Sequence, residues 1–209
     1  MDKYQRTLET WDKVAQHYQE KFMDLDLYDD TYDQFCQQVE KKNPHILEIG
    51  CGPGNITRQL LARRPDFKIQ AVDVSPNMIQ LASRNNPAAS FRVMDCRHID
   101  TLTTTFDAIV CGFCIPYLSG QDVSKLIKDS TMLLNDRGIL YLSFIEGDYE
   151  SSGYETASSG DKAYVYYYQA DHFHSLLAAH FETIALYHKS YSGGPDKMAS
   201  HLIFIARKK

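Results

Sequence analysis

Short apolar runs alternate along the chain with longer segments in which apolar residues recur every three or four positions. The short runs have the length and composition of buried strands, and they lie at 45–49, 68–73, 89–94, 106–111 and 139–145. Helical spacing stands between them, for example at Val123, Leu126 and Ile127. This alternation predicts one α/β domain built around a mostly parallel sheet.

The two ends of the chain depart from this alternation. Apolar residues at helical spacing predict an N-terminal helix over 11–22 and a second helix over 28–42. Near the C-terminus, a helix at 171–180 precedes strands at 182–188 and 201–206. We expect these two strands to pair as an antiparallel edge of the sheet, with a loop between them.

The strand at 45–49 ends in a glycine-rich turn. Gly50, Gly52 and Gly54 are spaced G-x-G-x-G, and helical spacing begins directly after them. A strand, a glycine turn and a helix N-terminus together let a ligand lie against bare backbone. Asn55 stands where a dinucleotide-binding fold would place its third glycine, so the spacing argues against a dinucleotide.

Acidic residues end the next two predicted strands. Asp73 lies about twenty residues beyond the glycines, where a carboxylate can accept hydrogen bonds from both hydroxyls of a ribose. The alternative is that Asp73 only precedes the helix that starts near Pro76, with Ser75 as the more natural cap. Asp95 follows the third strand in the same way.

These motifs together resemble those of the class I S-adenosylmethionine-dependent methyltransferases. Residues 48–54 are similar to that family's motif I, 73–78 to motif II, 95–97 to motif III and 106–117 to motif IV. The resemblance implies a Rossmann-like, seven-stranded, mostly parallel sheet with helices on both faces and an antiparallel last strand. It also implies an N-terminal helical cap and S-adenosylmethionine as cofactor, with S-adenosylhomocysteine as product.

The resemblance also implies roles for individual residues. The glycines would face the methionine end of the cofactor, Asp73 the ribose, and Asp95 with the Cys96 N–H the adenine. Glu48 would order the turn and the methionine amine, or it is an ordinary ion-pairing residue at a strand end. The implied cofactor residues are Tyr18, Glu48, Gly50, Gly52, Gly54, Asp73, Val74, Met78, Asp95, Cys96 and Cys111, and the implied substrate residues are Phe113 and Tyr117.

The activity implied by the resemblance is in-line transfer of a methyl group to a small-molecule acceptor. Such a displacement needs chiefly a positioned nucleophile and the exclusion of water, and a general base is optional. Base candidates are His172, His174 and Glu146, although the two histidines also suit a role as surface caps of a helix. A cofactor-binding sensor or partner subunit without transferase activity stays open as an alternative.

Two observations favour a small acceptor. Residues 114–117 read Cys-Ile-Pro-Tyr and lack the Asn or Asp that begins the tetrapeptide of amine-methylating relatives. Basic residues are scattered and fewer than acidic ones, 22 against 27, for a net charge of −5. We therefore do not expect nucleic acid as a partner.

Composition sets the remaining expectations. A chain of 209 residues forms one domain, which we divide into a helical cap (1–43), a cofactor-binding half (44–145), and a substrate flap with the sheet edge (146–209). Residues 146–160 are polar and without periodicity, and we interpret them as the flap. The sequence has no apolar membrane span and no secretory signal, and its five cysteines do not suggest disulfides. We expect a cytoplasmic protein without a metal.

Overall fold

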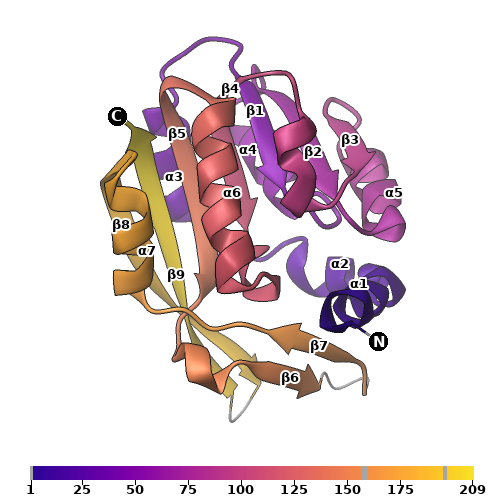
Figure 1. The fold of residues 1–209 in the computed structure, drawn as a ribbon. Helices are drawn as coiled ribbons and strands as arrows, with labels where there is room; N and C mark the ends of the chain where they lie inside the picture. Colours follow the sequence, from indigo (N-terminus) through magenta and orange to yellow (C-terminus); the bar gives the residue numbers. More distant parts are fainter. Residues whose placement is uncertain (1, 157–159, 195–196) are drawn as a thin grey trace.

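A seven-stranded sheet forms the centre of the computed structural model, which describes residues 2–156, 160–194 and 197–209 (Figure 1). Its strands are β1 (His45–Ile49), β2 (Lys68–Asp73), β3 (Ser90–Val93), β4 (Phe106–Gly112), β5 (Leu134–Ile145), β8 (Phe181–Gly194) and β9 (Lys197–Lys208). They lie in the order β3-β2-β1-β4-β5-β9-β8. The first five strands are parallel, and β9 is antiparallel to both β5 and β8. The predicted Rossmann-like sheet is confirmed.

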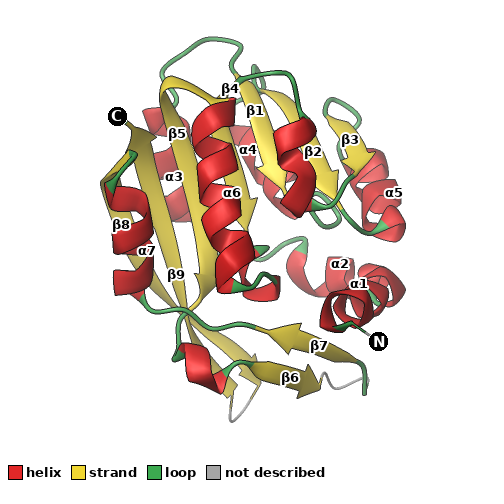
Figure 2. Cartoon of the chain, viewed as in Figure 1, coloured by secondary structure: helices red, strands yellow, loops and turns green. Residues whose placement is uncertain are grey.

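Helices cover both faces of this sheet (Figure 2). The helices are α1 (Lys3–Lys13), α2 (Ala15–Phe22), α3 (Asp29–Gln38), α4 (Asn55–Arg63), α5 (Pro76–Asn85), α6 (Gly120–Leu133) and α7 (Ala170–Ala178). Short 3-10 helices are η1 (Cys96–Thr101), η2 (Ile115–Tyr117) and η3 (Tyr149–Ser151). One core lies between the sheet and α6 and α7, and a second lies beneath α3, α4 and α5. Because both faces are covered, β1 is buried from Ile46 to Ile49.

The N-terminal cap consists of two helices, whereas the sequence predicted one over 11–22. Helix α1 begins at Lys3, eight residues earlier, and Val14 leaves helical geometry between α1 and α2, with φ −95° and ψ 10°. The break brings the rings of Trp11 and Tyr18 to 5.6 Å in an edge-to-face contact. Both helices lie across the carboxyl ends of the parallel strands (Figure 1).

Segment 146–160 is more ordered than its polar composition predicted. It contains η3 and β6 (Gly153–Thr156), which pairs with β7 (Lys162–Val165) as a separate hairpin, while residues 157–159 lie outside the described chain. The hairpin packs against the cap. The Thr10 hydroxyl donates to the Lys162 carbonyl at 2.7 Å, and the Tyr164 N–H donates to the Thr7 hydroxyl at 3.0 Å.

Strands β5, β8 and β9 are longer than the sequence predicted. Strand β5 begins at Leu134, before the predicted 139, and a bulge shifts its register against β4 between Phe106 and Ala108. The connection expected at 190–200 is occupied by the extended ends of β8 and β9, which pair from Ser190↔Ser200 to Gly194↔Lys197; Pro195 lies outside the described residues. Pairing between β8 and β9 satisfies the backbone hydrogen bonds of these polar segments, so both strands extend beyond the apolar runs that predicted them.

Among the residues that the structure describes, no helix is long and apolar enough to cross a membrane. The same residues contain no group of three or more His, Cys, Asp or Glu placed to hold a metal ion.

Candidate functional site

The glycine turn after β1 adopts the backbone that its sequence requires. Gly50, Gly52 and Gly54 all have positive φ, at 69°, 52° and 81°. A Cβ at Gly50 would lie 2.8 Å from the Cβ of Cys114, and a Cβ at Gly54 would lie 2.4 Å from the Asn86 amide nitrogen. Side chains are therefore excluded by both conformation and space. Gly54 caps α4, so the N-terminus of that helix begins at the turn.

A cavity opens over this turn, between the carboxyl ends of β1, β2 and β4 and the helix α1. Ten of the thirteen residues that the sequence proposed for cofactor or substrate line it: Tyr18, Gly50, Gly52, Asp73, Val74, Met78, Asp95, Cys96, Phe113 and Tyr117. Helix α1 contributes Tyr4, Thr7, Leu8 and Trp11 to the opposite wall. We call this the first cavity.

Asp73 holds the turn together from the end of β2. Its two carboxylate oxygens accept hydrogen bonds from the backbone N–H groups of Gly52 and Ser75, both at 2.9 Å. Burial raises the pKa of Asp73, although these backbone donors act in the opposite direction. Ser75 is the N-cap of α5, so the cap and the strand-end carboxylate are separate residues. Each carboxylate oxygen keeps a further lone pair for a ligand in the cavity.

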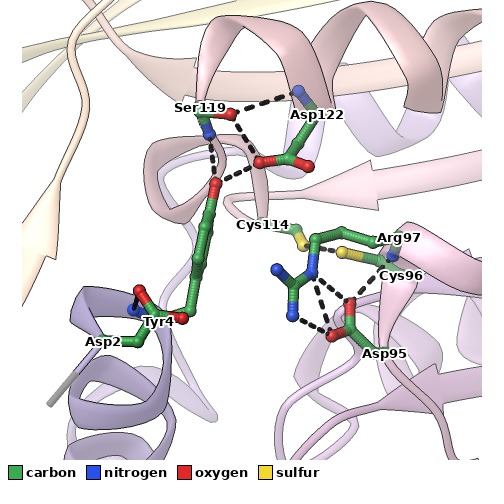
Figure 3. A network of polar contacts seen from close by, with 8 residues as sticks. All are labelled: Asp2, Tyr4, Asp95, Cys96, Arg97, Cys114, Ser119 and Asp122. Atoms are coloured by element: carbon green, nitrogen blue, oxygen red, sulfur yellow. Dashed lines mark hydrogen bonds and ion pairs between the residues drawn. The ribbon is translucent and has the colours of Figure 1, made fainter.

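Asp95 forms an ion pair with Arg97, two residues farther along the chain (Figure 3). The guanidinium donates to both carboxylate oxygens at 2.6–3.1 Å and lies 4.4 Å from the centre of the Tyr4 ring. Burial alone would raise the pKa of Asp95, but the hydrogen bonds from Arg97 hold it below its ordinary value. A nucleobase that approaches Asp95 therefore meets a carboxylate that is already paired.

Tyr4 ties α1 to the sheet (Figure 3). Its hydroxyl donates to the Asp122 carboxylate and accepts from the Ser119 N–H at 2.9 Å, at the start of α6. Burial, followed by the hydrogen bond to Asp122, raises the pKa of Tyr4, so the phenol stays protonated. The cap is thus anchored to the sheet body at the rim of the first cavity.

Glu48 lies beneath the glycine turn and does not line the cavity. It is 1% exposed, and its Oε2 accepts a hydrogen bond of 2.5 Å from the Thr57 hydroxyl on α4. Burial raises the pKa of Glu48 to about 8. None of the ion pairs of the described chain includes Glu48, so the ion-pair alternative is wrong there. Oε1 is buried without a hydrogen-bond partner among the same residues.

The other predicted site residues lie away from the first cavity. Gly54 is buried behind the turn, and Cys111 is 1% exposed in the core against α6. The histidines of α7 lie on its exposed surface, where His172 stacks on Tyr168 and His174 contacts Phe204. Glu146 accepts a hydrogen bond from the Ser200 hydroxyl at 2.6 Å. None of His172, His174 and Glu146 lines a described cavity, because α7 packs against the sheet face and not across the strand ends.

A second cavity adjoins the first, between α2, α3, the carboxyl ends of β4, β5 and β8, and the amino-terminal part of β9. The two cavities share a wall formed by Trp11, Tyr18, Gly50, Gly52, Gly112, Phe113 and Tyr117. Aromatic rings dominate the remaining lining, including Phe22, Tyr28, Tyr32 and Tyr191. No lysine, arginine, aspartate or glutamate is among its described lining residues.

One residue of the second cavity, His201 on β9, escaped prediction. It is 6% exposed, its Nδ1 lies 2.6 Å from the Tyr28 hydroxyl, and its ring stacks on Tyr191 with 5.0 Å between centroids. Burial lowers the pKa of His201 to about 4, so the imidazole is neutral at physiological pH. The sequence offered one signal, a polar side chain at the start of an otherwise apolar strand. Its partner Tyr28 lies 173 residues away, beyond the reach of local patterns.

Phe113 adopts an unusual backbone in the wall between the cavities. Its φ is +53°, in the left-handed region that a bulky side chain rarely occupies. The Phe113 N–H donates to the Ser143 hydroxyl at 2.9 Å, and its ring lies 4.8 Å from that of His201 and 5.2 Å from that of Tyr28. Strain of this kind persists where surrounding contacts hold it, and it is frequent at binding sites.

Comparisons with known proteins agree with this geometry. Residues 46–138 match the family described as "Methyltransferase domain". The chain is 33% identical over 129 residues to the malonyl-[acyl-carrier protein] O-methyltransferase of Anoxybacillus flavithermus. This alignment covers 54% of this chain and 48% of that protein. The chain is 24% identical over 176 residues to the tRNA N(3)-methylcytidine methyltransferase of Schizosaccharomyces pombe, covering 79% and 70% of the two chains.

A solved structure shares the whole fold. The magnesium protoporphyrin IX methyltransferase of Synechocystis, determined with bound S-adenosylmethionine, superposes with a TM-score of 0.71 and 14% identity over 100% of this chain and 98% of that one. The chain spans about half the length of several curated relatives that it matches, from 39% to 51% in four of them. Together, the domain match over residues 46–138, the sheet topology and the strand-end residues make this chain similar to the class I S-adenosylmethionine-dependent methyltransferases.

Proposed function

We propose that the chain binds S-adenosylmethionine in the first cavity and transfers its methyl group to a small molecule in the second. The observation that carries this proposal is the wall that the two cavities share. A donor on one side and an acceptor on the other would meet between Tyr18, Phe113 and Tyr117. Transfer by in-line displacement requires that kind of apposition with water excluded.

The residues of the first cavity fit the cofactor. Asp73 offers lone pairs to the ribose hydroxyls, and Gly50 and Gly52 leave bare backbone for the methionine end. Val74 and Met78 supply apolar surface for the adenine. When bound, the cofactor supplies a methyl group activated by its sulfonium. Asp95 would reach the adenine only by sharing its carboxylate with Arg97.

The three-part division of the chain fits this proposal. Residues 1–43 cover the first cavity, and residues 44–145 supply its glycine turn and strand ends. Residues 146–209 contribute Tyr191 and His201 to the second cavity and carry the β6–β7 hairpin that packs on α1. We assign acceptor binding chiefly to this last part, together with α2 and α3.

The comparisons leave two kinds of acceptor to weigh. One relative is an O-methyltransferase that acts on a carrier-bound malonyl group, and another methylates tRNA. The second cavity has no described cation with which to hold a phosphate or a carboxylate, and the net charge of −5 disfavours a polyanion. A small neutral acceptor fits better than either.

The test is calorimetric binding of S-adenosylhomocysteine combined with transfer of labelled methyl groups to a panel of metabolites and to tRNA. Asp73→Asn should weaken S-adenosylhomocysteine binding at least tenfold, because an amide NH₂ cannot replace a carboxylate oxygen that accepts from backbone and ribose. The matched control is Asp136→Asn, at an exposed position at the opposite end of the sheet. Failure to bind the cofactor would overturn the proposal. Tight binding without transfer to any acceptor would favour a sensor, and transfer to tRNA alone would favour the nucleic-acid relative.

A further inference from the structure

We propose that the acceptor is an uncharged aromatic alcohol, and that His201 accepts the proton of its hydroxyl group during methyl transfer. This inference rests on the proposed function and specifies the substrate class of the second cavity. It stands on three observations: the aromatic walls, the absence of charge in the described lining, and one imidazole nitrogen left without a partner.

The walls favour a flat, apolar ligand. Phe22, Tyr28, Phe113 and Tyr191 surround the cavity with ring faces and edges. Rings of this kind bind another ring by stacking or edge-to-face contact, worth about 0.5–1.5 kcal/mol for each pair beyond buried area. An aliphatic metabolite would forgo these ring contacts, and apart from the aromatic side chains and His201 the only polar side chains in the described lining are the amides of Asn55 and Gln59. An aromatic acceptor uses the surface that is present.

The lining also excludes charged acceptors. An anion or a cation loses its hydration on entering, and no described residue of opposite charge lines the cavity to compensate. The nearest lysine on β8 is Lys189, which pairs with Asp30 at 2.6 Å. Lys21 lies outside, 6.0 Å from the centre of the Tyr191 ring. A carboxylate, phosphate or ammonium acceptor is therefore disfavoured, and a neutral hydroxyl is preferred.

His201 is the polar group that a hydroxyl would meet. Its Nδ1 is engaged with Tyr28, and Nε2 makes no hydrogen bond with the described chain. Nε2 is nevertheless not among the fully buried polar atoms that lack a partner, so it retains contact with the cavity. In the tautomer that donates from Nδ1 to the Tyr28 oxygen, Nε2 is a free acceptor.

The surroundings keep this imidazole neutral until the reaction. Its ring contacts are Tyr28, Phe113 and Tyr191. Its register partners are Ile145 on β5 and Lys189 on β8, and the Lys189 ammonium pairs with Asp30. Glu146 follows Ile145, the register partner of His201 on β5. Its Oε2 accepts a hydrogen bond from the Ser200 hydroxyl and lies 3.8 Å from Nδ1 of His188. Burial is what lowers the pKa of His201, so its acceptor nitrogen is available throughout the physiological pH range.

The step balances as follows in atoms and electrons. A lone pair of the acceptor oxygen forms the new bond to the methyl carbon, and the carbon–sulfur bond breaks with its electron pair remaining on sulfur. The hydroxyl proton passes to Nε2 of His201, and the resulting imidazolium donates from Nδ1 to the Tyr28 oxygen. The products are an aryl methyl ether and S-adenosylhomocysteine, and His201 then loses its proton to water.

Two measurements on the full chain test the inference. First, acceptor binding is followed by fluorescence of the only tryptophan, Trp11, which lines both cavities. With S-adenosylhomocysteine present, naphthols and substituted phenols should change this signal, whereas matched benzoates and benzylamines should bind at least tenfold more weakly. Second, the same compounds are assayed for transfer of labelled methyl groups.

The variant His201→Gln separates proton acceptance from packing. With a weakly acidic phenol, we expect the turnover of the variant near pH 7 to be roughly 10²-fold below that of wild type. This loss is at the low end for removal of a general base, because the low pKa of His201 makes it a weak base. Turnover of the variant should recover as pH rises toward the pKa of the phenol, while wild-type turnover stays level. A nitrophenol, already ionised, should bind more weakly than a neutral phenol, but its turnover at saturation should depend little on His201. His188→Gln, an exposed histidine on the adjacent strand, is the matched control and should behave as wild type.

Each outcome decides the matter. Methylation of amines or carboxylates but not of phenols would overturn the inference and leave the proposed function standing. Equal losses for phenol and nitrophenol in His201→Gln, without recovery at high pH, would show that His201 only shapes the cavity. Failure to bind S-adenosylhomocysteine or to methylate any compound would overturn the proposed function itself, and the inference with it.

Discussion

The first cavity presents carboxylates and bare backbone to its ligand, whereas the second presents mainly aromatic rings, with one neutral imidazole and the amides of Asn55 and Gln59. Polar atoms at fixed positions select a ligand by hydrogen bonds, since a poorly matched ligand leaves buried groups unpaired. An apolar cavity selects differently, because any charge that enters it loses hydration without compensation. Under the proposed function, the two sides of one wall recognise a polar cofactor by attraction and a neutral acceptor by exclusion.

Two buried titratable groups near the cavities, Glu48 and His201, are both held in their neutral forms despite this contrast. Glu48 lies beneath the first cavity and His201 in the second, with pKa values of about 8 and about 4. Burial is the first cause in each case. Both groups therefore make the stability of the fold depend on pH, and they do so in opposite directions.

The largest expected effect is on stability through Glu48. Its folded pKa lies above its ordinary value of 4.5, so its contribution is full below pH 4.5 and is lost as pH rises toward 8. At about 1.4 kcal/mol per pKa unit, the loss is on the order of 5 kcal/mol. Urea unfolding of Glu48→Gln between pH 4.5 and 8.5 should lack this decline, because the amide never ionises and its oxygen still accepts from Thr57.

A control and a counterpart sharpen this result. Glu182→Gln, at an exposed position on β8, should retain the wild-type slope. His201→Gln should instead remove a loss of stability on the acid side, between pH 6.5 and 4, on the order of 3 kcal/mol. Identical slopes in wild type and Glu48→Gln would mean that Glu48 ionises freely and is not enclosed beneath the turn.

The next effect concerns the glycine turn. Gly50→Ala combines a φ of +69° with a Cβ placed 2.8 Å from that of Cys114, so we expect S-adenosylhomocysteine affinity to fall at least 30-fold, about 2 kcal/mol. Calorimetry measures it, with thermal unfolding to follow the fold. Gly160→Ala is the matched control, since Gly160 also has positive φ, at 83°, but nothing lies within 4 Å of its Cβ position. Equal effects of both variants on affinity would contradict a special role for the turn.

The sequence predicted the first cavity better than the second, and the reason is physical. The turn and Asp73 lie within 24 residues of one another on consecutive strands, and a parallel sheet brings consecutive strand ends together. Spacing alone therefore predicted most of the first cavity. The second cavity joins α2 and α3 to β9, and the contact of Tyr28 with His201 depends on the completed fold. Side-chain alternation marks a face of a strand, but it does not show what packs on that face.

The cap shows the same limit. A helix was predicted only from Trp11 onward, where apolar spacing is strong, yet α1 begins at Lys3. Its first turns are polar and are held by distant partners, as Tyr4 is by Asp122 and Thr7 by the N–H of Tyr164. Most helical stability in proteins comes from such tertiary contacts and not from local propensity. The Arg97 partner of Asp95 was also missed, although it is close in sequence. A separation of two residues gives no periodic signal that would reveal the pair.

A smaller effect tests the apolar side of the comparison. Tyr191→Ala removes a ring that stacks on His201, so we expect acceptor KM to rise roughly tenfold, about 1.4 kcal/mol, with S-adenosylhomocysteine affinity changed less than twofold. Tyr154→Ala is the control, at an exposed ring on β6 away from both cavities. A parallel loss of cofactor affinity would show that the two cavities do not act as separate sites.

The smallest expected effect comes from Arg97→Gln, on the polar side. The ion pair with Asp95 is partly exposed, and such pairs contribute about 1 kcal/mol or less. Removing the guanidinium frees both carboxylate oxygens for the cofactor, and the pKa of Asp95 should rise toward its ordinary value. We therefore expect S-adenosylhomocysteine affinity at pH 7.5 to increase by up to fivefold, and this gain to shrink as pH falls below 5 and Asp95 becomes protonated. Calorimetry at both pH values measures it, with Arg92→Gln, an exposed arginine on β3, as control. A tenfold loss of affinity instead would mean that Arg97 holds Asp95 in the orientation that binds adenine, so that the ion pair belongs to the site and does not compete with it.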